Sequence, residues 1–275
     1  MWYIIIIGIT LCAAALLFSS CSQGLWNGKE GVDWRGVSVV AHRAGAGVAP
    51  ENSLAAVDKA LSVGVDGIEV DVHLTADGEL VVCHDNTIER TTNGIGCISE
   101  MTLEEIRTYR IVAADGTITE EPLPTLGDVL WRINGRCRVL VEVKRTKNAE
   151  RVAKALINEV ALYQAAGWVA VQSFDTEVLA HIHRLGHPFP IEKLFYFKVP
   201  FLPLAYDGSL ARFNFSKYDY ISSFNFHYKY ISPRLVKKIH SCGKSIKVWT
   251  LDGPKESPML PVDAVITDRP DLWER

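Results

Sequence analysis

The sequence lacks the marks of several common classes of protein. Its 29 Lys and Arg residues are outnumbered by 32 Asp and Glu residues, and the formal net charge is −3. A chain without an overall positive field does not attract nucleic acid, so we exclude nucleic acid as a partner. The six cysteines are widely and irregularly spaced, which fits neither a zinc-ligand pattern nor a dense disulfide framework. No internal repeat or low-complexity segment stands out.

The N-terminus carries a long apolar run without charge. The segment WYIIIIGITLCAAALLF at 2–18 is followed by SSCSQG, and an apolar segment that ends in small residues before a cysteine is typical of an export signal. The letters L-F-S-S-C resemble a bacterial lipobox, which predicts a signal peptide over 1–20, lipidation of Cys21 and a lipidated tether over 21–36. The alternative is an uncleaved N-terminal membrane anchor, because the run is at the lower edge of a spanning length. Both readings predict an extracytoplasmic, membrane-tethered protein, and the first predicts a lipoprotein of the periplasm or outer membrane.

The rest of the chain alternates between strand-like and helical patterns. With 275 residues, 48% of them apolar, it is long enough for one large α/β barrel or two small domains. Helical patterns between the apolar runs favour a parallel sheet covered by helices. The strand-like runs are 37–42, 67–72, 79–84, 138–143, 168–174, 193–198, 218–224, 245–250 and 264–267, and the helical patterns are 52–63, 125–133, 148–166, 175–185 and 232–241.

One short connection decides how the nine apolar runs fit together. The segment LTADGEL is too short for a crossover helix, so 67–75 and 79–84 should form an antiparallel hairpin. If 79–84 is the returning arm, eight runs remain, the number that closes a (β/α)8 TIM barrel over 37–275. The stretch 86–124 is too long for a simple barrel loop and predicts a small insertion, whereas 199–217 predicts an irregular crossover.

Three carboxylates are expected at the carboxyl ends of two strands. Residues two apart on a strand share a face, so Glu69 and Asp71 in GIEVDV point the same way, as do Glu142 and Lys144 in LVEVK. Neighbouring carboxylates repel unless a cation or a proton lies between them. Three of them at the functional end of a barrel predict a hard-oxygen site for Mg²⁺ or Ca²⁺.

Two histidines are expected to converge on these carboxylates. His42 ends the first strand, and His84 follows the arm of the hairpin that runs back alongside Asp71. A pair of histidines beside a divalent cation can act as general base and general acid. The other histidines have no comparable context and are expected in loops or in packing: His73, His181, His183, His187, His227 and His240.

An ordered set of motifs resembles the glycerophosphodiester phosphodiesterase family. The motifs are AHRAGAGVAPENS, GIEVDVHLTADGELVVCHDNTIERTTNGIG, PTLGDVL, VEVK, QSFD, VWTLD and AVITDRPD, in the family's order and spacing through most of the chain. The resemblance implies a (β/α)8 barrel with a small insertion after the second histidine. It also implies hydrolysis of a glycerophosphodiester to glycerol 3-phosphate and an alcohol.

The resemblance also implies roles for individual residues. Glu69, Asp71 and Glu142 would bind the metal, and His42 and His84 would be the acid–base pair, with His42 assigned as base and His84 as acid. Arg43 and Lys144 would contact the phosphate. The further positions are Glu51, expected to orient the site; Trp249, expected at the pocket rim or in the core; Phe174, expected in the core; and Arg90, expected as a solvated loop arginine rather than one that reaches the phosphate from the insertion.

One position departs from the family pattern. The usual H-R-G reads His42-Arg43-Ala44 here, followed by Gly45. Either Ala44 tolerates the turn that glycine normally makes, or Gly45 takes it over through a shifted backbone.

Two alternative functions remain open at this point. The membrane tether and the apolar residues of 199–217 would suit a lipid-directed phosphodiesterase, such as a lysophospholipase D or a phospholipase C-like enzyme. A non-catalytic lipoprotein that binds phosphodiesters is the alternative from another class. The sequence predicts a small-molecule substrate and no particular oligomeric state.

Overall fold

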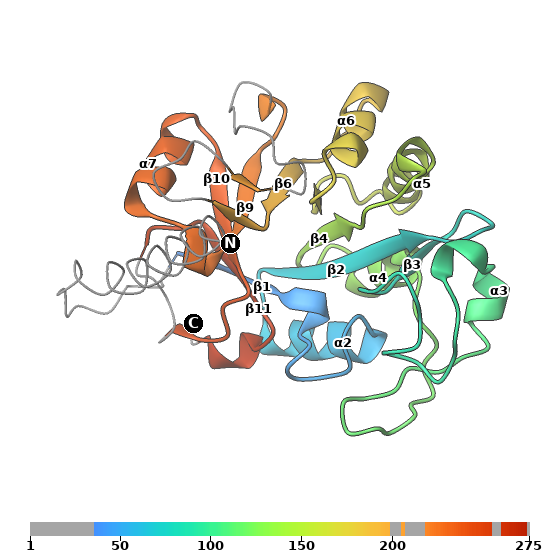
Figure 1. Cartoon of the computed structure of the whole chain (residues 1–275). Helices are drawn as coiled ribbons and strands as arrows, with labels where there is room; N and C mark the ends of the chain where they lie inside the picture. Colours follow the sequence, from blue (N-terminus) through green and yellow to red (C-terminus); the bar gives the residue numbers. More distant parts are fainter. Residues whose placement is uncertain (1–35, 199–204, 207–217, 255–259, 274–275) are drawn as a thin grey trace, which may run out of the picture. The chain divides into compact units, whose positions relative to one another are not determined.

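Eight parallel strands close into a barrel in the computed structural model, which describes residues 36–198, 205–206, 218–254 and 260–273 (Figure 1). The strands follow the order β1-β11-β10-β9-β6-β5-β4-β2, and β1 pairs with both β11 and β2, which closes the ring. The predicted (β/α)8 barrel is therefore confirmed. The strands are β1 (Ser38–Ala41), β2 (Gly67–Leu74), β4 (Arg138–Val143), β5 (Val169–Ser173), β6 (Ile191–Phe195), β9 (Ser223–His227), β10 (Ser245–Trp249) and β11 (Ala264–Thr267).

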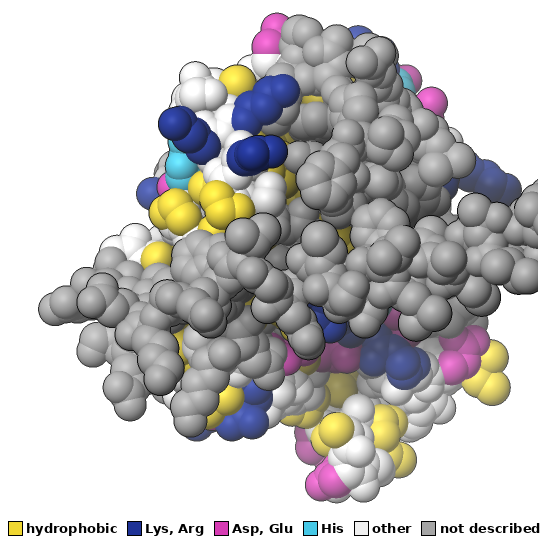
Figure 2. Space-filling model, turned by 60° about the vertical axis from the view of Figure 1, so that its left-hand side comes forward, with side chains coloured by type: hydrophobic (Ala, Val, Ile, Leu, Met, Phe, Trp, Pro, Cys, Tyr) yellow, Lys and Arg dark blue, Asp and Glu magenta, His cyan; other side chains and the backbone are white. Residues whose placement is uncertain are grey.

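Helices cover the outside of the barrel, and all but α5 of the five named here begin at a side-chain cap. Ser53 and Thr125 accept hydrogen bonds from the first turns of α2 and α4, and Gly64 ends α2 with the left-handed backbone that glycine allows. Their apolar faces pack on the strands, so that α7 buries Leu235 and Ile239 and leaves its lysines outside. Figure 2 shows Lys and Arg side chains on the described surface. The helices are α2 (Leu54–Val63), α4 (Leu126–Ile133), α5 (Ala149–Leu162), α6 (Thr176–Leu185) and α7 (Pro233–Ser241).

The hairpin after β2 is antiparallel, as its short connection predicts. Strand β3 (Leu80–Val82) pairs with β2 through Val72–Val82 and Leu74–Leu80. The following insertion contains the short helix α3 (Leu103–Ile106) and has an apolar cluster of its own. Its buried members are Val81, Cys83, Ile88, Ile98, Ile106, Ile111 and Leu123.

Two predicted strand positions were wrong by several residues. The strand predicted at 218–224 is β9 at Ser223–His227, because the amide of Ile221 donates to the carbonyl of Tyr218 and forms a turn first. Tyr218 and Ile221 are buried in that turn, so their apolar character marked burial rather than strand. The strand predicted at 193–198 is β6 at Ile191–Phe195, and a separate two-residue strand, β7 (Phe197–Lys198), pairs with β8 (Ala205–Tyr206).

Several predicted features lie outside the described residues. They are the signal peptide, the lipidated Cys21, all of the tether except residue 36, and most of the 199–217 crossover. No helix in the described part of the chain is long and apolar enough to cross a bilayer.

The inside of the barrel is divided into an apolar and a polar layer. Val40 of β1, Leu140 of β4, and Ala264 and Ile266 of β11 form one buried apolar cluster inside the ring. Polar side chains lie beyond this cluster, toward the carboxyl ends of the strands. The apolar layer closes the barrel, and functional groups gather at the end where barrels of this kind carry their active sites.

Candidate active site

A cavity of about 1040 Å³ lies at the carboxyl ends of the barrel strands. Five residues that the sequence singled out as chemical groups line it: His42, Arg43, His84, Glu142 and Lys144. They lie directly after β1, after β3, and at or directly after the end of β4, so the closed sheet brings together residues up to about a hundred positions apart in the chain.

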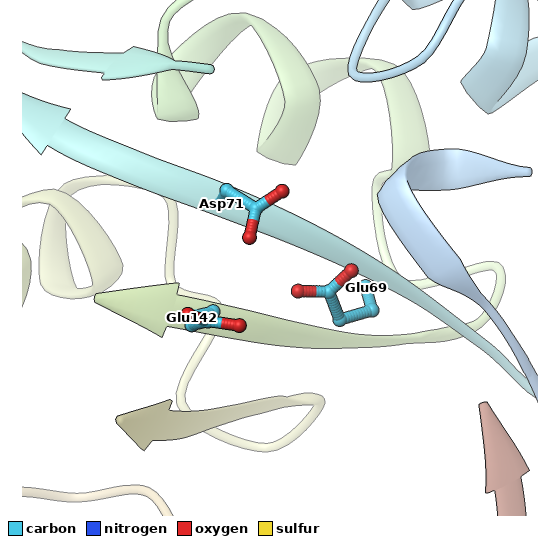
Figure 3. A group of neighbouring side chains, drawn as sticks. All are labelled: Glu69, Asp71 and Glu142. Atoms are coloured by element: carbon cyan, nitrogen blue, oxygen red, sulfur yellow. The ribbon is translucent and has the colours of Figure 1, made fainter. Parts of the chain in front are cut away.

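Three buried carboxylates lie side by side in the barrel (Figure 3). Glu69 and Asp71 come from β2 and Glu142 from β4, and the parallel register pairs Asp71 with Glu142. One oxygen from each lies within 4.8 Å of the others. Oε1 of Glu69 is buried and has no hydrogen-bond partner among the described residues. A buried oxygen-only cluster with an unsatisfied acceptor fits a divalent cation such as Mg²⁺ or Ca²⁺.

The charges of this triad are compensated unequally. Burial, together with the charges of Asp71 and Glu142, raises the pKa of Glu69 to about 8. Burial also raises the pKa of Glu142. Burial acts the same way on Asp71, but the Lys144 ammonium and the two site histidines outweigh it and hold the pKa of Asp71 at about 2. Lys144 Nζ lies 2.6 Å from an oxygen of Asp71 and 2.6 Å from an oxygen of Glu142, so it neutralises two members of the triad directly.

His42 is held by a carboxylate from the strand that closes the barrel. Its Nδ1 lies 2.6 Å from Oδ1 of Asp268, and its Nε2 lies 4.0 Å from Oε2 of Glu69. Burial acts to lower the pKa of His42, but the hydrogen bond to Asp268 and the charge of Glu69 raise it to about 9. Asp268 was not predicted from the sequence. Asp268 directly follows β11, and His42 directly follows the neighbouring strand β1. This shared position at the ends of two strands is the signal that could have identified Asp268.

His84 has a similar partner on its own segment. Its Nδ1 lies 2.6 Å from Oδ1 of Asp85, and its backbone carbonyl lies 3.2 Å from Nε2 of His73, which also lines the cavity. Burial and the Lys144 charge lower the pKa of His84. Neither Asp85 nor His73 was recognised from the sequence, and His73 belongs to the site rather than to an ordinary loop.

The turn after β1 adopts an unusual backbone. Arg43, Ala44 and Gly45 have φ angles of 48°, 62° and 101°, so Ala44 tolerates the left-handed conformation and Gly45 shares it. Left-handed backbone costs a residue with a Cβ roughly 1–2 kcal/mol. The turn directs the amide of Arg43 onto Oε2 of Glu69 at 2.8 Å, and strain held at such a position is common at functional sites.

The residues that follow this turn hold the site in place. Nη1 of Arg43 donates to both oxygens of Glu51, at 3.1 and 3.3 Å. Asn52, which is buried, donates from Nδ2 to Oδ2 of Asp71 at 2.8 Å. Asn52 was missed, although it belongs to the same P-E-N motif as Glu51. Arg90 is an exposed loop arginine, as expected, and it is also ion-paired with Glu51 and Asp85.

An aromatic wall forms the opposite side of the cavity. Phe174, after β5, stacks on Tyr196 at a centroid distance of 4.0 Å and meets Trp249 edge-on at 5.7 Å. All three line the cavity. The expectation that Phe174 lies in the core was wrong, since it follows the end of its strand and is only partly buried. Trp249 fulfils both of its alternatives, because it lines the cavity and packs on the apolar cluster inside the barrel.

A hydrogen-bonded polar group lies beneath the aromatic wall. Nδ2 of Asn225 donates to Gln172 and to Glu192, each at 2.8 Å, and Lys247 is ion-paired with Glu192. Gln172 also lines the cavity. These partners satisfy the buried charges of β6 and β10, and none of them was predicted as a site residue.

The fold and the site together describe a (β/α)8 barrel whose buried acidic triad fits a hard cation. A family model described as the glycerophosphoryl diester phosphodiesterase family matches residues 42–272. A glycerophosphodiester phosphodiesterase of Caldanaerobacter subterraneus subsp. tengcongensis is 31% identical over 239 residues, which cover 85% of this chain and 94% of that protein. The chain belongs to the glycerophosphoryl diester phosphodiesterase family and is an enzyme of this class.

Solved structures share the fold. A glycerophosphodiester phosphodiesterase from Parabacteroides distasonis has a TM-score of 0.69 at 28% identity, and the match covers 86% of this chain and 94% of that one. An Oleispira antarctica phosphodiesterase, solved with its product sn-glycerol-3-phosphate, has a TM-score of 0.73 at 22% identity and matches over 85% of this chain and 93% of its own. Since this chain is an enzyme, the non-catalytic binding protein considered above is set aside.

Proposed function

We propose that this enzyme hydrolyses glycerophosphodiesters to glycerol 3-phosphate and an alcohol in a reaction that requires Mg²⁺ or Ca²⁺. The observation that carries the proposal is the buried triad, in which one oxygen from each residue lies within 4.8 Å of the others. It lies beside a cavity that Glu142 and the two histidines line. The product bound to the Oleispira antarctica phosphodiesterase is the glycerol phosphate expected here.

Glu69, Asp71 and Glu142 would hold the cation. A bound divalent cation supplies positive charge for the non-bridging phosphate oxygens and for the charge that develops in the transition state. The fit of the site rests on its all-oxygen donor set and on the unsatisfied Oε1 of Glu69.

The chain's own cations would bind the phosphate. Arg43 presents a guanidinium that Glu51 holds at one edge, which leaves its other donors for phosphate oxygens. Lys144 contributes a second positive charge at the level of Asp71 and Glu142. Both residues line the cavity, so they can reach a substrate that the histidines also reach.

The two histidines would carry the proton transfers. In each ring Nδ1 contacts an aspartate, at 2.6 Å in both cases, so Nε2 is the atom available to the substrate. One ring accepts the proton of the nucleophile, a water or the glycerol hydroxyl of the substrate, and the other protonates the leaving alkoxide. The sequence-based assignment has His42 as the base and His84 as the acid, whereas the raised pKa of His42 and the lowered pKa of His84 in the cation-free chain favour the reverse.

A panel of substrates with chelation tests the proposal. The enzyme is incubated with glycerophosphocholine, glycerophosphoethanolamine and glycerophosphoglycerol, then with EDTA, and then with Mg²⁺ or Ca²⁺ added back. Release of glycerol 3-phosphate should stop with EDTA and return with one of the ions. Hydrolysis that EDTA leaves untouched would contradict the role of the triad, and an absence of hydrolysis across the panel would contradict the proposed activity.

The aromatic wall favours one second candidate, a lysophospholipase D or phospholipase C-like activity on lipids. Phe174 and Tyr196 present apolar surface at the cavity, and Tyr196 is 47% exposed, so an apolar group could lie against them. Turnover of lysophosphatidylcholine above that of glycerophosphocholine would select the lipid-directed activity. The reverse order would select the soluble diesters.

The N-terminal segment would tether this enzyme outside the cytoplasm through a lipid on Cys21. Support comes from the apolar run 2–18 and the L-F-S-S-C letters that follow it.

A further inference from the structure

A single arginine of the insertion bridges two carboxylates from different segments. Nη1 and Nη2 of Arg90 donate to the two oxygens of Glu51, each at 2.8 Å, in a bidentate pair. Nε of the same guanidinium donates to Oδ2 of Asp85 at 2.5 Å. Three N–H donors of the Arg90 guanidinium therefore bind two carboxylates. Glu51 precedes the β2–β3 hairpin in the chain, and Asp85 follows it.

Each of these carboxylates has a second partner that lines the cavity. Glu51 accepts from Nη1 of Arg43 at 3.1 Å, and Oδ1 of Asp85 contacts Nδ1 of His84 at 2.6 Å. The result is a continuous chain from Arg43 through Glu51, Arg90 and Asp85 to His84. Arg90 lies at its centre and does not itself line the cavity.

We propose that Arg90 is a positioning residue that sets the orientations of Arg43 and His84 together. The inference rests on the proposed function, in which Arg43 binds phosphate and His84 transfers a proton. A carboxylate that contacts only Arg43 or only His84 can rotate. When the Arg90 guanidinium also binds it, its orientation is fixed, and so is the acceptor that it presents to Arg43 or His84. The insertion thus contributes to the site without touching the substrate.

The electrostatics agree with this geometry. The hydrogen bond from Arg90 is the main cause of the lowered pKa of Asp85. Burial acts to raise the pKa of Glu51, and the contact with Arg90 is the largest of the opposing influences that lower it overall. Both carboxylates therefore stay ionised and remain acceptors. A lysine would keep the charge but not the fork, because its ammonium cannot present three coplanar donors to two carboxylates.

The matched control is another arginine of the insertion. Arg107 is 46% exposed and donates from Nη2 to Oδ2 of Asp128 at 3.0 Å, whereas Arg90 is 47% exposed. Asp128 does not line the cavity. Arg107→Ala therefore removes a comparable surface ion pair of the same insertion that has no connection to Arg43 or His84.

The first experiment measures kcat and KM of full-length wild type, Arg90→Ala, Arg90→Lys and Arg107→Ala on glycerophosphocholine with saturating Mg²⁺. We expect Arg90→Ala to raise KM and lower kcat, with kcat/KM reduced roughly 10- to 100-fold, the scale of lost hydrogen bonds between charged groups. Arg90→Lys should recover part of this loss, and Arg107→Ala should match wild type. An active wild type with Arg90→Ala within twofold of Arg107→Ala would overturn the inference, whereas an inactive wild type would overturn the proposed function instead.

Double variants separate positioning from general structure. Arg43 binds the phosphate and should affect KM, whereas His84 transfers a proton and should affect kcat. In the Asp85→Asn background the link from Arg90 through Asp85 to His84 is already broken, so adding Arg90→Ala should still raise KM but leave kcat unchanged. Adding it to Glu51→Gln should still lower kcat but leave KM unchanged. If Arg90→Ala changed kcat and KM equally in both the Asp85→Asn and the Glu51→Gln variants, Arg90 would not act on Arg43 and His84 through two separate carboxylates.

Two further readouts exclude collapse of the loop. Arg90 does not contact Glu69, Asp71 or Glu142, so the affinity of Arg90→Ala for Mn²⁺, measured by calorimetry, should equal that of wild type. Guanidinium ion at a non-denaturing concentration should restore activity to Arg90→Ala, and an equal concentration of NaCl should not. Reduced Mn²⁺ affinity, or a loss of melting temperature beyond that of Arg107→Ala, would indicate a structural role and overturn the proposal.

Discussion

The contact between His42 and Asp268 predicts a pH-dependent loss of stability when Asp268→Asn is made in the cation-free enzyme. The pKa of His42 rises from 6.5 to about 9 in the folded chain, a difference of 9 − 6.5 = 2.5 units. At about 1.36 kcal/mol per unit, the upper bound is about 3.4 kcal/mol. Asp268 provides the largest of the influences that raise this pKa, so the variant should lose roughly 1–3 kcal/mol where the effect is complete.

The pH window follows from the sign of the shift. A raised histidine pKa means that the folded chain binds the proton more tightly, so its stabilisation is fully present below pH 6.5 and is lost as the pH rises through 9. Asp268→Asn should therefore be less stable than wild type at pH 6 and close to wild type at pH 9.5. Urea unfolding in EDTA at both pH values measures this difference.

A second histidine–aspartate pair is the control. Nε2 of His240 lies 3.0 Å from Oδ2 of Asp263, and both side chains are more than a third exposed, so solvent screens the pair. Asp263→Asn should show a much smaller change between pH 6 and pH 9.5. Equal destabilisation by Asp268→Asn at both pH values would contradict this prediction, because the stabilisation by Asp268 would then be independent of the proton on His42.

Four further predictions concern the proposed activity and the tether. His84→Ala should lower kcat roughly 10²–10⁴-fold without loss of melting temperature, and unchanged turnover would remove its role in proton transfer. Glu142→Gln should weaken Mg²⁺ binding in calorimetry by more than the roughly 10- to 100-fold that loss of a supporting contact costs; equal affinity would show that the ion binds elsewhere. Phe174→Ala should raise KM for glycerophosphocholine roughly 2- to 10-fold and leave kcat unchanged, whereas an altered kcat alone would contradict a binding role. Cys21→Ser should abolish incorporation of labelled palmitate and release the enzyme from membranes, and continued labelling would contradict lipidation at Cys21.

The carboxylate site could be predicted because it depends on a local rule. Alternate residues of a strand share a face, which brings Glu69 and Asp71 together without knowledge of the fold. The short LTADGEL connection required a hairpin, and the hairpin left eight strands for the barrel. Parallel register then pairs Asp71 with Glu142. Each of these steps uses only spacing and the length of a connection.

The partners of the two histidines depend on contacts that spacing does not reveal. Asp268 lies 226 positions from His42 and reaches it only because β1 pairs with β11 to close the ring. Asp85 is adjacent to His84, but an acidic residue next to a histidine is ordinary in a loop. The ion pairs of Arg90 were not predicted for the same reason, since they depend on the path of the insertion back toward Glu51.

The predictions for the aromatic residues were wrong for a different reason, because an apolar side chain can be buried in the core or exposed in a cavity. Phe174 follows its strand by one residue and turns into the cavity, whereas Tyr218 precedes β9 and is buried in a turn. Hydrophobicity favours burial in both cases and does not distinguish a residue before a strand from one after it. The direction of the chain makes this distinction, because residues just after parallel barrel strands lie at the functional end of the barrel.

The order of the strands explains why the cavity has two chemically different walls. Strands β4, β2, β1 and β11 are consecutive in the ring, and the metal-site carboxylates, Lys144, Arg43 and His42 lie on them or directly after them. Phe174 and Tyr196 follow β5 and β6, and Trp249 ends β10. Buried charges are costly unless they are paired, and gathering them on adjacent strands lets each one find a partner. A glycerophosphodiester has a matching division, because its ionised phosphate links the glycerol to an alcohol that can lie against the other wall. Changes in the aromatic wall should therefore alter preference for the alcohol while the phosphate chemistry of the opposite wall is preserved.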